Sequence, residues 1–323
     1  MLLLQRIKTG IPEFGEQAAI VSESYGGSKF RWILSMAWCL VRYGARPIDY
    51  VRFEFHKKSA HERNRYLTIY RYFHLLKKFG YREASVYGKI AEYQTFKNFI
   101  RRDWMCVTKE TDSVSVHEFI NKHGVVFAKP NHGDQGHGVE KIVASDATAI
   151  DRLLAACKTE QYVIEEQLHN IDEIARINPS SLNTVRAYTL YKYNGESTIL
   201  AVMLRVGRNG SHVDNWGSGG IGYNFDVETG VCLNYGRDKK NKPFIFHPDT
   251  NIQMVGYQLP QYEKLKEYIL QLSQVTPEAR FVGWDIAITP KGFDLVEMNC
   301  PGGHDFLQAF GEPFGDILKK GLS

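Results

Sequence analysis

Residues 281–299 read FVGWDIAITPKGFDLVEMN, which is two apolar runs on either side of a Pro-Lys-Gly segment at 290–292. Proline and glycine in so short a connection are typical of a tight turn, so the sequence predicts a β-hairpin. Side chains alternate along a strand, and Glu297 and Asn299 therefore project from the same face. Depending on the register of the turn, Asp285 lies opposite Glu297 or opposite the residue before it.

Two carboxylates that face each other repel unless they are protonated or bound to a cation. Proteins hold Mg²⁺ with one or two carboxylates, together with substrate phosphates and water. Asp285, Glu297 and Asn299 are therefore predicted metal ligands. The alternative is a pair of exposed acids neutralised by lysines. The apolar neighbours favour the metal site, because we expect them to face a core on the other side of the hairpin; they are Trp284, Ile286, Ile288, Val296 and Met298.

The same alternation predicts further strands upstream, separated by segments of helical spacing. We expect strands over residues 125–130, 139–143 and 162–166, and helices over about 146–157 and 260–274. The segments NTVRAYTLYKY and STILAVMLRVG flank Asn194-Gly195, which predicts a second hairpin. The expected fold class is α+β with antiparallel hairpins rather than a chain of βαβ units.

A glycine-rich stretch, NHGDQGHG at residues 131–138, follows the strand that carries Lys129. Its glycines are Gly133, Gly136 and Gly138, and glycine lets backbone N–H groups approach phosphate oxygens because no Cβ obstructs them. The spacing matches neither a Walker A loop nor a dinucleotide-binding fingerprint. A hairpin that covers a nucleotide and an exposed turn both remain compatible with this stretch.

The N-terminal part of the chain has a helical pattern from residue 29 to about residue 80, interrupted near Gly44 and Pro47. We expect SAHERNRYLTIYRYFHLLKKFG, residues 59–80, to form one amphipathic helix that ends at its final glycine. Its tyrosines and arginines could stack on nucleic acid, but a solvated basic helix face explains them more simply.

The 323-residue chain has a formal net charge of +4, which conceals an uneven distribution. Residues 1–109 carry 20 Lys and Arg against 9 Asp and Glu, whereas residues 110–323 carry 20 against 27, so the first part suits anionic partners. Five scattered cysteines without a CxxC pair are typical of reduced thiols in the cytoplasm, where we expect this protein.

The N-terminus lacks the apolar region and cleavage site of a signal peptide. The longest apolar run, residues 32–41, is too short to span a bilayer, although a basic helix there could rest on a membrane surface.

Taken in order and spacing, several segments resemble the sugar-transfer-associated branch of the ATP-grasp superfamily. They are YGARPIDYVRF, HERNRY, GKIAEYQTF, VVFAKPNHGDQGHGV, YVIEEQL, INPSSLNTVRAYT, LRVG with VDNWGSGGIGYNFDVETG, and GWDIAIT with LVEMNCPGG. The likeness extends from about Tyr43 to Gln308 and implies an ATP-grasp fold, in which two α+β subdomains enclose ATP. We then expect a mainly helical region at residues 1–85, a subdomain with a glycine-rich flap at 86–165 and a subdomain with the metal site at 166–323.

The resemblance also implies which residues bind ATP. Lys89 and Lys129 match the two nucleotide-binding lysines, and Lys129 would reach the α- and β-phosphates. Lys89 follows Gly88, where the family usually has aspartate. The loop with Gly133, Gly136 and Gly138 would act as the flap over the nucleotide.

Four consecutive residues match the hinge that reads the adenine edge with side-chain and backbone groups, namely Glu165, Glu166, Gln167 and Leu168. Asp172 matches the acid that holds the ribose hydroxyls, with Glu173 as its rival.

Asp285, Glu297 and Asn299 fall on the family's magnesium ligands, in agreement with the hairpin argument. Arg186 and Arg205 lie on strands beside the expected site, where similar residues contact the γ-phosphate or an acyl phosphate. Many relatives have an arginine two positions before the metal-binding aspartate, but this chain has Gly283 there, so the charge has to come from Arg186 or Arg205. Without the resemblance, a structural ion pair would be the simpler role for either arginine.

The family chemistry implies an ATP- and Mg²⁺-dependent ligase that joins a carboxylate to an amine through an acyl phosphate. A uronic acid of a surface polysaccharide, or of its precursor, is a candidate acid. A phosphotransferase that acts on a sugar hydroxyl and a non-catalytic nucleotide-binding assembly protein are the alternatives. Expected partners are ATP, an acidic sugar or other carboxylate, an amine and, at the periphery, membrane-bound polysaccharide machinery; no nucleic-acid partner is expected.

Overall fold

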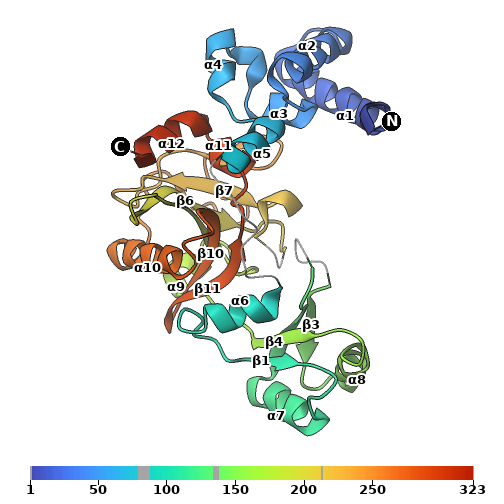
Figure 1. The fold of residues 1–323 in the computed structure, drawn as a ribbon, viewed down its shortest axis with the longest axis vertical. Helices are drawn as coiled ribbons and strands as arrows, with labels where there is room; N and C mark the ends of the chain where they lie inside the picture. The colour runs from blue at the N-terminus through green and yellow to red at the C-terminus, as the bar shows by residue number, and fades with distance from the viewer. Residues whose placement is uncertain (1, 79–87, 134–137, 212–213, 323) are drawn as a thin grey trace.

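The computed structural model describes residues 2–78, 88–133, 138–211 and 214–322. The elements form three groups along the long axis of the molecule (Figure 1). Helices from the N-terminal part lie at one end, a seven-stranded sheet lies in the middle and a four-stranded sheet lies at the other end. The strand pairs of both sheets are antiparallel, which confirms the expected α+β class. The division at residues 85 and 165 stays a prediction.

The described N-terminal part of the chain forms five α-helices, of which the first three pack around a small core of their own. They are α1 (Leu2–Tyr25), α2 (Lys29–Tyr43), α3 (Pro47–Arg52), α4 (Ala60–Arg65) and α5 (Ile69–Lys78). Ser28 caps α2 by accepting a hydrogen bond from the Arg31 amide, and Gly44 ends it with a φ of 66°. The expected interruption near Gly44 is therefore confirmed.

Residues 59–78 form two helices, so the expected single helix is wrong. The chain leaves the helical conformation at Tyr66. The Leu67 amide donates to Gln308 Oε1 at 2.8 Å, and the Thr68 hydroxyl donates to the Tyr43 carbonyl at 2.9 Å. Gln308 thus satisfies a backbone group that a continuous helix would have bonded within itself, and Tyr43 holds the Thr68 side chain. The expected end at Gly80 lies outside the described residues.

The four-stranded sheet has the order β1-β4-β2-β3. Its strands are β1 (Trp104–Val107), β2 (Val125–Pro130), β3 (Glu140–Val143) and β4 (Tyr162–Glu166). Helices α7 (Ser113–His123) and α8 (Ala147–Ala156) pack on it, and their apolar side chains share a core with β2 and β4. The strands expected over 125–130, 139–143 and 162–166 are thus confirmed, as is the helix between the last two.

The seven-stranded sheet has the order β11-β10-β5-β6-β7-β8-β9. Its strands are β5 (Thr184–Tyr191), β6 (Ser197–Val206), β7 (Ile221–Phe225), β8 (Gly236–Arg237), β9 (Pro243–Phe244), β10 (Phe281–Thr289) and β11 (Gly292–Asn299). Both expected hairpins are present, because β5 pairs with β6 and β10 pairs with β11.

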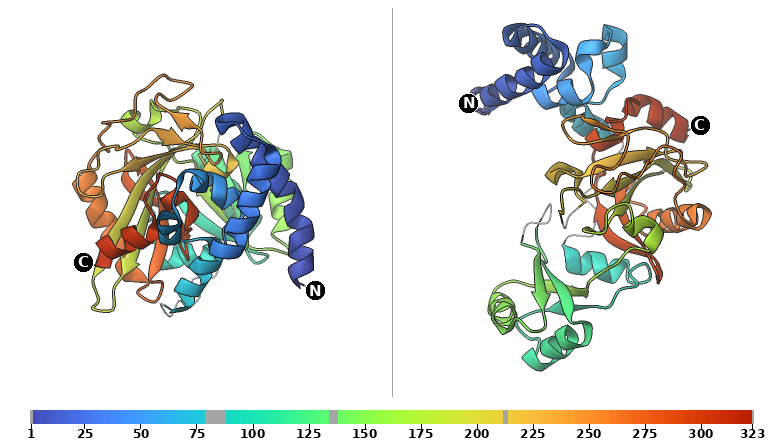
Figure 2. Two further views of the ribbon diagram at one scale, coloured as in Figure 1. Left: turned by 90° about the horizontal axis from the view of Figure 1, so that it is seen from above. Right: turned by 180° about the vertical axis from the view of Figure 1, so that it is seen from behind.

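Helices cover both faces of this sheet (Figure 2). Helix α10 (Tyr262–Val275) packs on the face that includes Val185, Val202 and Trp284. The opposite face, which includes Tyr188 and Met203, packs against α5, α11 (Asp305–Gln308) and α12 (Phe314–Leu322). The C-terminal helices therefore lie between the large sheet and the N-terminal helices, and α5 contributes to the core of the large sheet.

Two short helices lie where the sheets approach each other, namely α6 (Lys89–Thr95) and α9 (Asp172–Ala175). Tyr93 of α6 and Phe96, which follows the helix, belong to the core of the large sheet, and Tyr93 also makes an edge contact with Trp104 of β1. Helix α6 thus connects the two sheets.

Within the described ranges, the structure contains no helix with both the length and the apolar character needed to cross a membrane.

Candidate active site

The β10–β11 hairpin brings the predicted metal ligands together. Asp285 lies directly opposite Glu297, and the Asn299 amide nitrogen is 3.3 Å from Asp285 Oδ2. The register therefore confirms the alternative that places these three side chains on one face. The pairing shifts by one residue beside Asp285, which is a β-bulge. Because of the bulge, Leu295 is buried in the core and Val296 is only half-buried, so the expected inward position of Val296 is wrong.

Two arginines surround the Asp285 carboxylate. Arg186 on β5 donates through Nε to Oδ1 and through Nη2 to Oδ2, the second bond at 2.9 Å, and Arg205 Nη2 on β6 lies 3.0 Å from Oδ2. Burial raises the pKa of Asp285, but attraction to the two arginines outweighs burial and holds the pKa below its ordinary value. The Arg186 side chain passes over Gly283, where a Cβ atom would lie 3.4 Å from its Cδ. Arg186 thus brings charge to a position where glycine supplies none.

A buried polar network extends from Arg205. Its guanidinium donates to the Thr184 hydroxyl at 2.7 Å and lies 3.7 Å from Asp214, whose carboxylate accepts a bond from the Thr184 amide at 2.9 Å. Asp214 and Trp216 are both buried, so the described part of the segment between β6 and β7 packs against the sheet at this point. Nothing in the sequence pattern identified Thr184 and Asp214 as neighbours of Arg205.

Lys89 is the first residue of α6, and its side chain points to the β10–β11 hairpin. Its Nζ is 3.2 Å from Glu297 Oε1. Gly88 has a φ of 88°, and a Cβ atom there would come within 2.8 Å of Asn131 Oδ1, the atom that accepts a bond from the Ile90 amide. An aspartate at residue 88 would be strained by both effects, which explains why glycine precedes the lysine.

Glu92, on the same helix, is a site residue that the sequence did not indicate. It is buried, and its Oε1 accepts a bond of 2.7 Å from the Met298 amide, which holds α6 against β11. Burial, with repulsion from Glu297 as the second cause, raises the pKa of Glu92 to about 7.

Lys129 belongs to a second buried network, on the small sheet. Its Nζ is 2.5 Å from Glu165 Oε1, and the other oxygen of Glu165 accepts from Arg102 Nε at 2.6 Å. The Tyr93 hydroxyl contacts Glu165, Arg102 and Lys129, and Arg102 also pairs with Asp294 of β11. Burial opposes the charge of Glu165, but Arg102 and Lys129 outweigh it and lower its pKa to about 2. Glu165 is therefore an ionised partner that positions Lys129.

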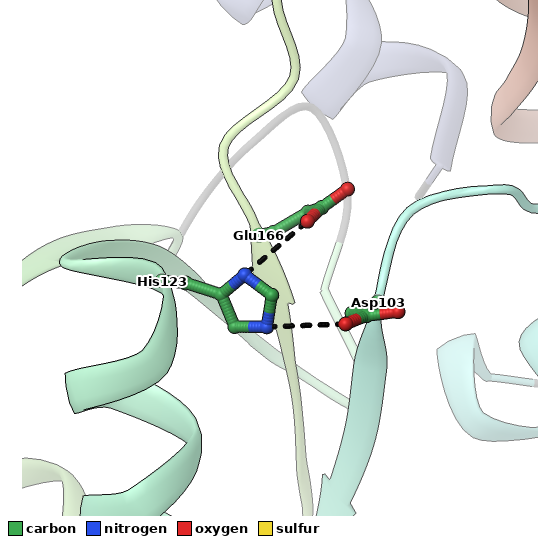
Figure 3. Close-up of side chains that lie close together, drawn as sticks. All are labelled: Asp103, His123 and Glu166. Atoms are coloured by element: carbon green, nitrogen blue, oxygen red, sulfur yellow. Dashed lines mark ion pairs between the residues drawn. The ribbon is translucent and has the colours of Figure 1, made fainter. Parts of the chain in front are cut away.

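Glu166 is held by a separate cluster (Figure 3). His123 Nδ1 lies 3.2 Å from Glu166, and its Nε2 lies 3.4 Å from Asp103. One ligand atom from each of these residues lies within 4.8 Å of the others, as a metal site requires. Lys122 already pairs with Asp103 and Lys291 with Glu166, each at 2.5 Å. The cluster thus has its own cations, and it fixes the end of β4.

The remaining predicted nucleotide residues lie at the edges of this region. Gln167 and Leu168 are half-buried in the segment after β4, and Asp172 is the exposed first residue of α9. Gly133 and Gly138 stand on either side of residues 134–137, and Gly136 lies outside the described residues. The roles of all these residues stay predictions.

The donor set at the hairpin suits a hard cation, because it consists of carboxylate and amide oxygens. Among the described residues, Lys89 is the one ion-pair partner of Glu297, whose side chain is partly exposed. Asp285 Oδ2, by contrast, already faces three nitrogen donors, whereas Oδ1 faces one. Mg²⁺ therefore fits Glu297, the Asn299 carbonyl and Oδ1 of Asp285.

Comparison with known proteins gave one family and several similar folds. The family described as sugar-transfer associated ATP-grasp matches residues 89–312. Among proteins with curated functions, none matches the sequence.

Among solved structures, D-alanyl-alanine synthetase A from Vibrio cholerae is 13% identical over 73% of this chain and 63% of its own, with a TM-score of 0.46. For N5-carboxyaminoimidazole synthetase from Staphylococcus aureus, complexed with ADP, identity is 12% over 68% of this chain and 45% of its own, with a TM-score of 0.42. D-alanine–D-alanine ligase from Bacillus anthracis is 13% identical over 77% of this chain and 73% of its own, with a TM-score of 0.44. The aligned part spans less than two thirds of the first two proteins. Because the family match covers more than half of its residues, the chain belongs to the sugar-transfer associated ATP-grasp family.

Proposed function

We propose that this protein is an ATP- and Mg²⁺-dependent ligase that joins a carboxylate to an amine through an acyl phosphate. One observation carries the proposal: Arg186 and Arg205 converge on Asp285 beside Glu297, and α6 connects this cluster to Lys129. Acyl phosphate formation requires cations arranged around a transferring phosphoryl group more than it requires a protein nucleophile. The site offers four such cations.

In the first step a substrate carboxylate oxygen forms a bond to the γ-phosphorus, and the bond between that phosphorus and the β,γ-bridging oxygen breaks, releasing ADP. Lys89 and Lys129 would hold the phosphates, and Arg186 with Arg205 would neutralise charge on the transferring group. Mg²⁺, when bound at Glu297, Asn299 and Asp285, supplies further charge neutralisation of the phosphates. In the second step the amine attacks the acyl carbon, phosphate leaves and the nitrogen loses a proton.

The network around Thr184 has a defined part in this proposal. Thr184 and Asp214 contact the Arg205 guanidinium independently of Arg186, so they would keep its orientation if Arg186 moved toward a phosphate. A preorganised cation needs little reorganisation during the reaction, which is where electrostatic catalysis gains most.

We further propose that the acid is a uronic acid of a surface polysaccharide or its precursor, and that the reaction takes place in the cytoplasm near membrane-bound polysaccharide machinery. The family description, with its reference to sugar transfer, supports the substrate class. The five scattered cysteines, without a CxxC pair, support the compartment.

The test is release of ADP from ATP in the presence of uronic acids and amines, followed by mass spectrometry of the products. The proposal predicts ADP formation that depends on both substrates and an amide of their summed mass less water. ADP formed without an amide or thioester contradicts the ligase. A stable phosphorylated sugar would instead identify a phosphotransferase.

A further inference from the structure

The outer face of α2 carries a stripe of large apolar side chains that packs against nothing in the described structure. Phe30, Leu34, Trp38 and Val41 are 69%, 55%, 60% and 83% exposed. Residues spaced by three or four positions lie on one side of a helix, so these four form one continuous stripe, which we call the α2 stripe.

The inner face of the same helix is well packed. Met36, Cys39 and Tyr43 are buried in the core of the N-terminal helices, and both ends of α2 are capped. The helix is therefore held in its orientation by its inner face, and the α2 stripe is free to contact a partner. One exposed apolar residue is ordinary on a protein surface, but four on a single helix face mark an interaction surface.

Charge identifies the partner. Helix α2 carries Lys29, Arg31 and Arg42, all exposed, and no acidic residue. At 100° per residue, Arg31 and Arg42 lie within about 20° of each other, directly beside Trp38 at the edge of the α2 stripe. The described N-terminal segment 12–78 has 12 Lys and Arg against 6 Asp and Glu. An apolar stripe bordered by cations suits an anionic surface, whereas a second copy of the same face would bring like charges together.

We propose that the α2 stripe docks the protein onto an anionic phospholipid bilayer. The helix would lie in the plane of the membrane, with Phe30, Leu34 and Trp38 at the boundary between headgroups and acyl chains and the arginines beside lipid phosphates. Tryptophan, phenylalanine and leucine on one face with basic residues beside them are typical of interfacial helices. The helix lies at the end of the molecule farthest from the small sheet, so docking leaves the candidate active site accessible (Figure 1). The proposal does not depend on the reaction that the protein catalyses.

The experiment is co-sedimentation of the purified full-length chain with vesicles of phosphatidylcholine alone or of phosphatidylcholine with phosphatidylglycerol. A basic side chain near an anionic surface gives about a fivefold gain in partitioning, or about 1 kcal/mol, so Arg31 and Arg42 predict a preference of at least about tenfold for anionic vesicles. The variant Phe30→Gln/Leu34→Gln/Trp38→Gln should lose at least about tenfold of this binding. Its matched control, Val114→Gln/Leu233→Gln/Ile245→Gln, changes exposed apolar residues on other elements and should bind as the parent does.

A charge variant, Arg31→Gln/Arg42→Gln, provides a second test that leaves the apolar residues in place. This variant should lose the preference for anionic vesicles. Any binding that remains should no longer depend on the salt concentration. Equal thermal unfolding of parent and variants shows that the chain is folded in each case. The proposal is overturned if the parent ignores anionic vesicles or if the stripe variant binds them as well as the parent does. It is also overturned if the parent is a dimer by light scattering that the stripe variant converts to a monomer, because the partner is then a second copy.

Discussion

At the scale of single residues, the candidate site is defined by how each buried charge is compensated. Asp285 pairs with two arginines, and Glu165 pairs with Arg102 and Lys129. In the part of the chain that the structure describes, Glu92 accepts a close hydrogen bond from the Met298 amide and forms no ion pair. A buried carboxylate keeps its charge where cations surround it and tends to hold a proton where they do not. The three carboxylates thus differ in ionisation although all three are acidic residues in one region.

Arg186 should be required for phosphoryl transfer. In Arg186→Lys one charge remains, but the paired contact with both oxygens of Asp285 is lost, because lysine lacks the planar fork. We expect kcat for ADP formation to fall about 10²- to 10³-fold. Arg152→Lys is the control, since Arg152 makes an exposed ion pair on α8. An Arg186→Lys enzyme with the parental kcat would remove Arg186 from the mechanism.

Glu92 should make stability fall as pH rises. Its pKa is about 7 in the folded protein against an ordinary value of 4.5, so the folded state binds more protons than the unfolded state between these pH values. The contribution of Glu92 to the free energy of unfolding is therefore greatest below about pH 4.5, and it declines as the pH rises to about 7. Glu92→Gln, which keeps the acceptor for the Met298 amide, should be more stable than the parent at pH 8, by on the order of 2 kcal/mol, and similar at pH 5.

Urea unfolding at the two pH values measures this difference. Glu23→Gln, at an exposed position of α1, should show no such dependence. Equal stability of Glu92→Gln and the parent at pH 8 would contradict a protonated Glu92.

The shared face of Asp285, Glu297 and Asn299 could be predicted from the sequence, because the alternation of side chains along two paired strands determines it. It did not predict that Arg186 pairs with Asp285. That contact depends on β5 lying next to β10, and the two residues are 99 positions apart in the chain. Arg102 was missed for the same reason, because its partners lie 63 and 192 positions away.

At the scale of elements, α6 is the part of the structure that relates the two halves of the site. Its Lys89 contacts Glu297 of the large sheet, and its Tyr93 contacts Lys129 and Glu165 of the small sheet. The backbone carbonyl of Asn131, just after β2, accepts a hydrogen bond of 2.9 Å from the Lys89 amide. A displacement of α6 would therefore move Lys89 relative to Glu297 and break the contact between Tyr93 and Lys129.

Gly88→Ala tests this role of α6. The alanine Cβ would have both an unfavourable positive φ and a close contact with Asn131, so α6 should shift and KM for ATP should rise about tenfold. Gly124→Ala is a matched control, because Gly124 also has a positive φ, of 71°, but has open space around it. Both variants should lose about 1 kcal/mol of stability from backbone strain, but only Gly88→Ala should affect ATP. The same KM in both variants would contradict the role of α6.

Elements defined by local pattern were predictable, and elements defined by distant partners were not. The hairpins at 184–206 and 281–299 follow from alternation and turn residues. The break between α4 and α5 has no local signal, because Gln308 and Tyr43 supply the bonds that interrupt the helix. The bulge beside Asp285 likewise shifted the core from Val296 to Leu295 without a proline or glycine at the position.

At the scale of the whole molecule, the charge asymmetry divides between two tasks. The basic first part of the chain supplies Lys89 to the candidate site and the cations beside the α2 stripe at the far end. The acidic second part supplies the predicted metal ligands. If the sheets enclose ATP and Mg²⁺, binding should stabilise the folded chain as a unit, because ligand contacts come from both sheets.

Thermal unfolding should reveal this linkage. MgATP at about 100 times its Kd should add about 2.7 kcal/mol of stability, and removal of the metal with a chelator should abolish most of the gain. Glu297→Gln should reduce the gain, whereas Glu267→Gln on α10 should not, because Glu267 is exposed and lies outside the site. A full MgATP effect in Glu297→Gln would exclude Glu297 as a metal ligand.

In the proposed reaction, the chain activates a carboxylate by forming an acyl phosphate. The most direct test uses an acid that stimulates ADP release, labelled with ¹⁸O in its carboxylate, together with an amine and unlabelled ATP. If an acyl phosphate forms, one ¹⁸O atom per turnover should appear in the released phosphate, because the carboxylate oxygen bonds to phosphorus and leaves with it. Unlabelled phosphate, with all label retained in the acid or product, would show that phosphorus never bonded to the carboxylate and would exclude an acyl phosphate.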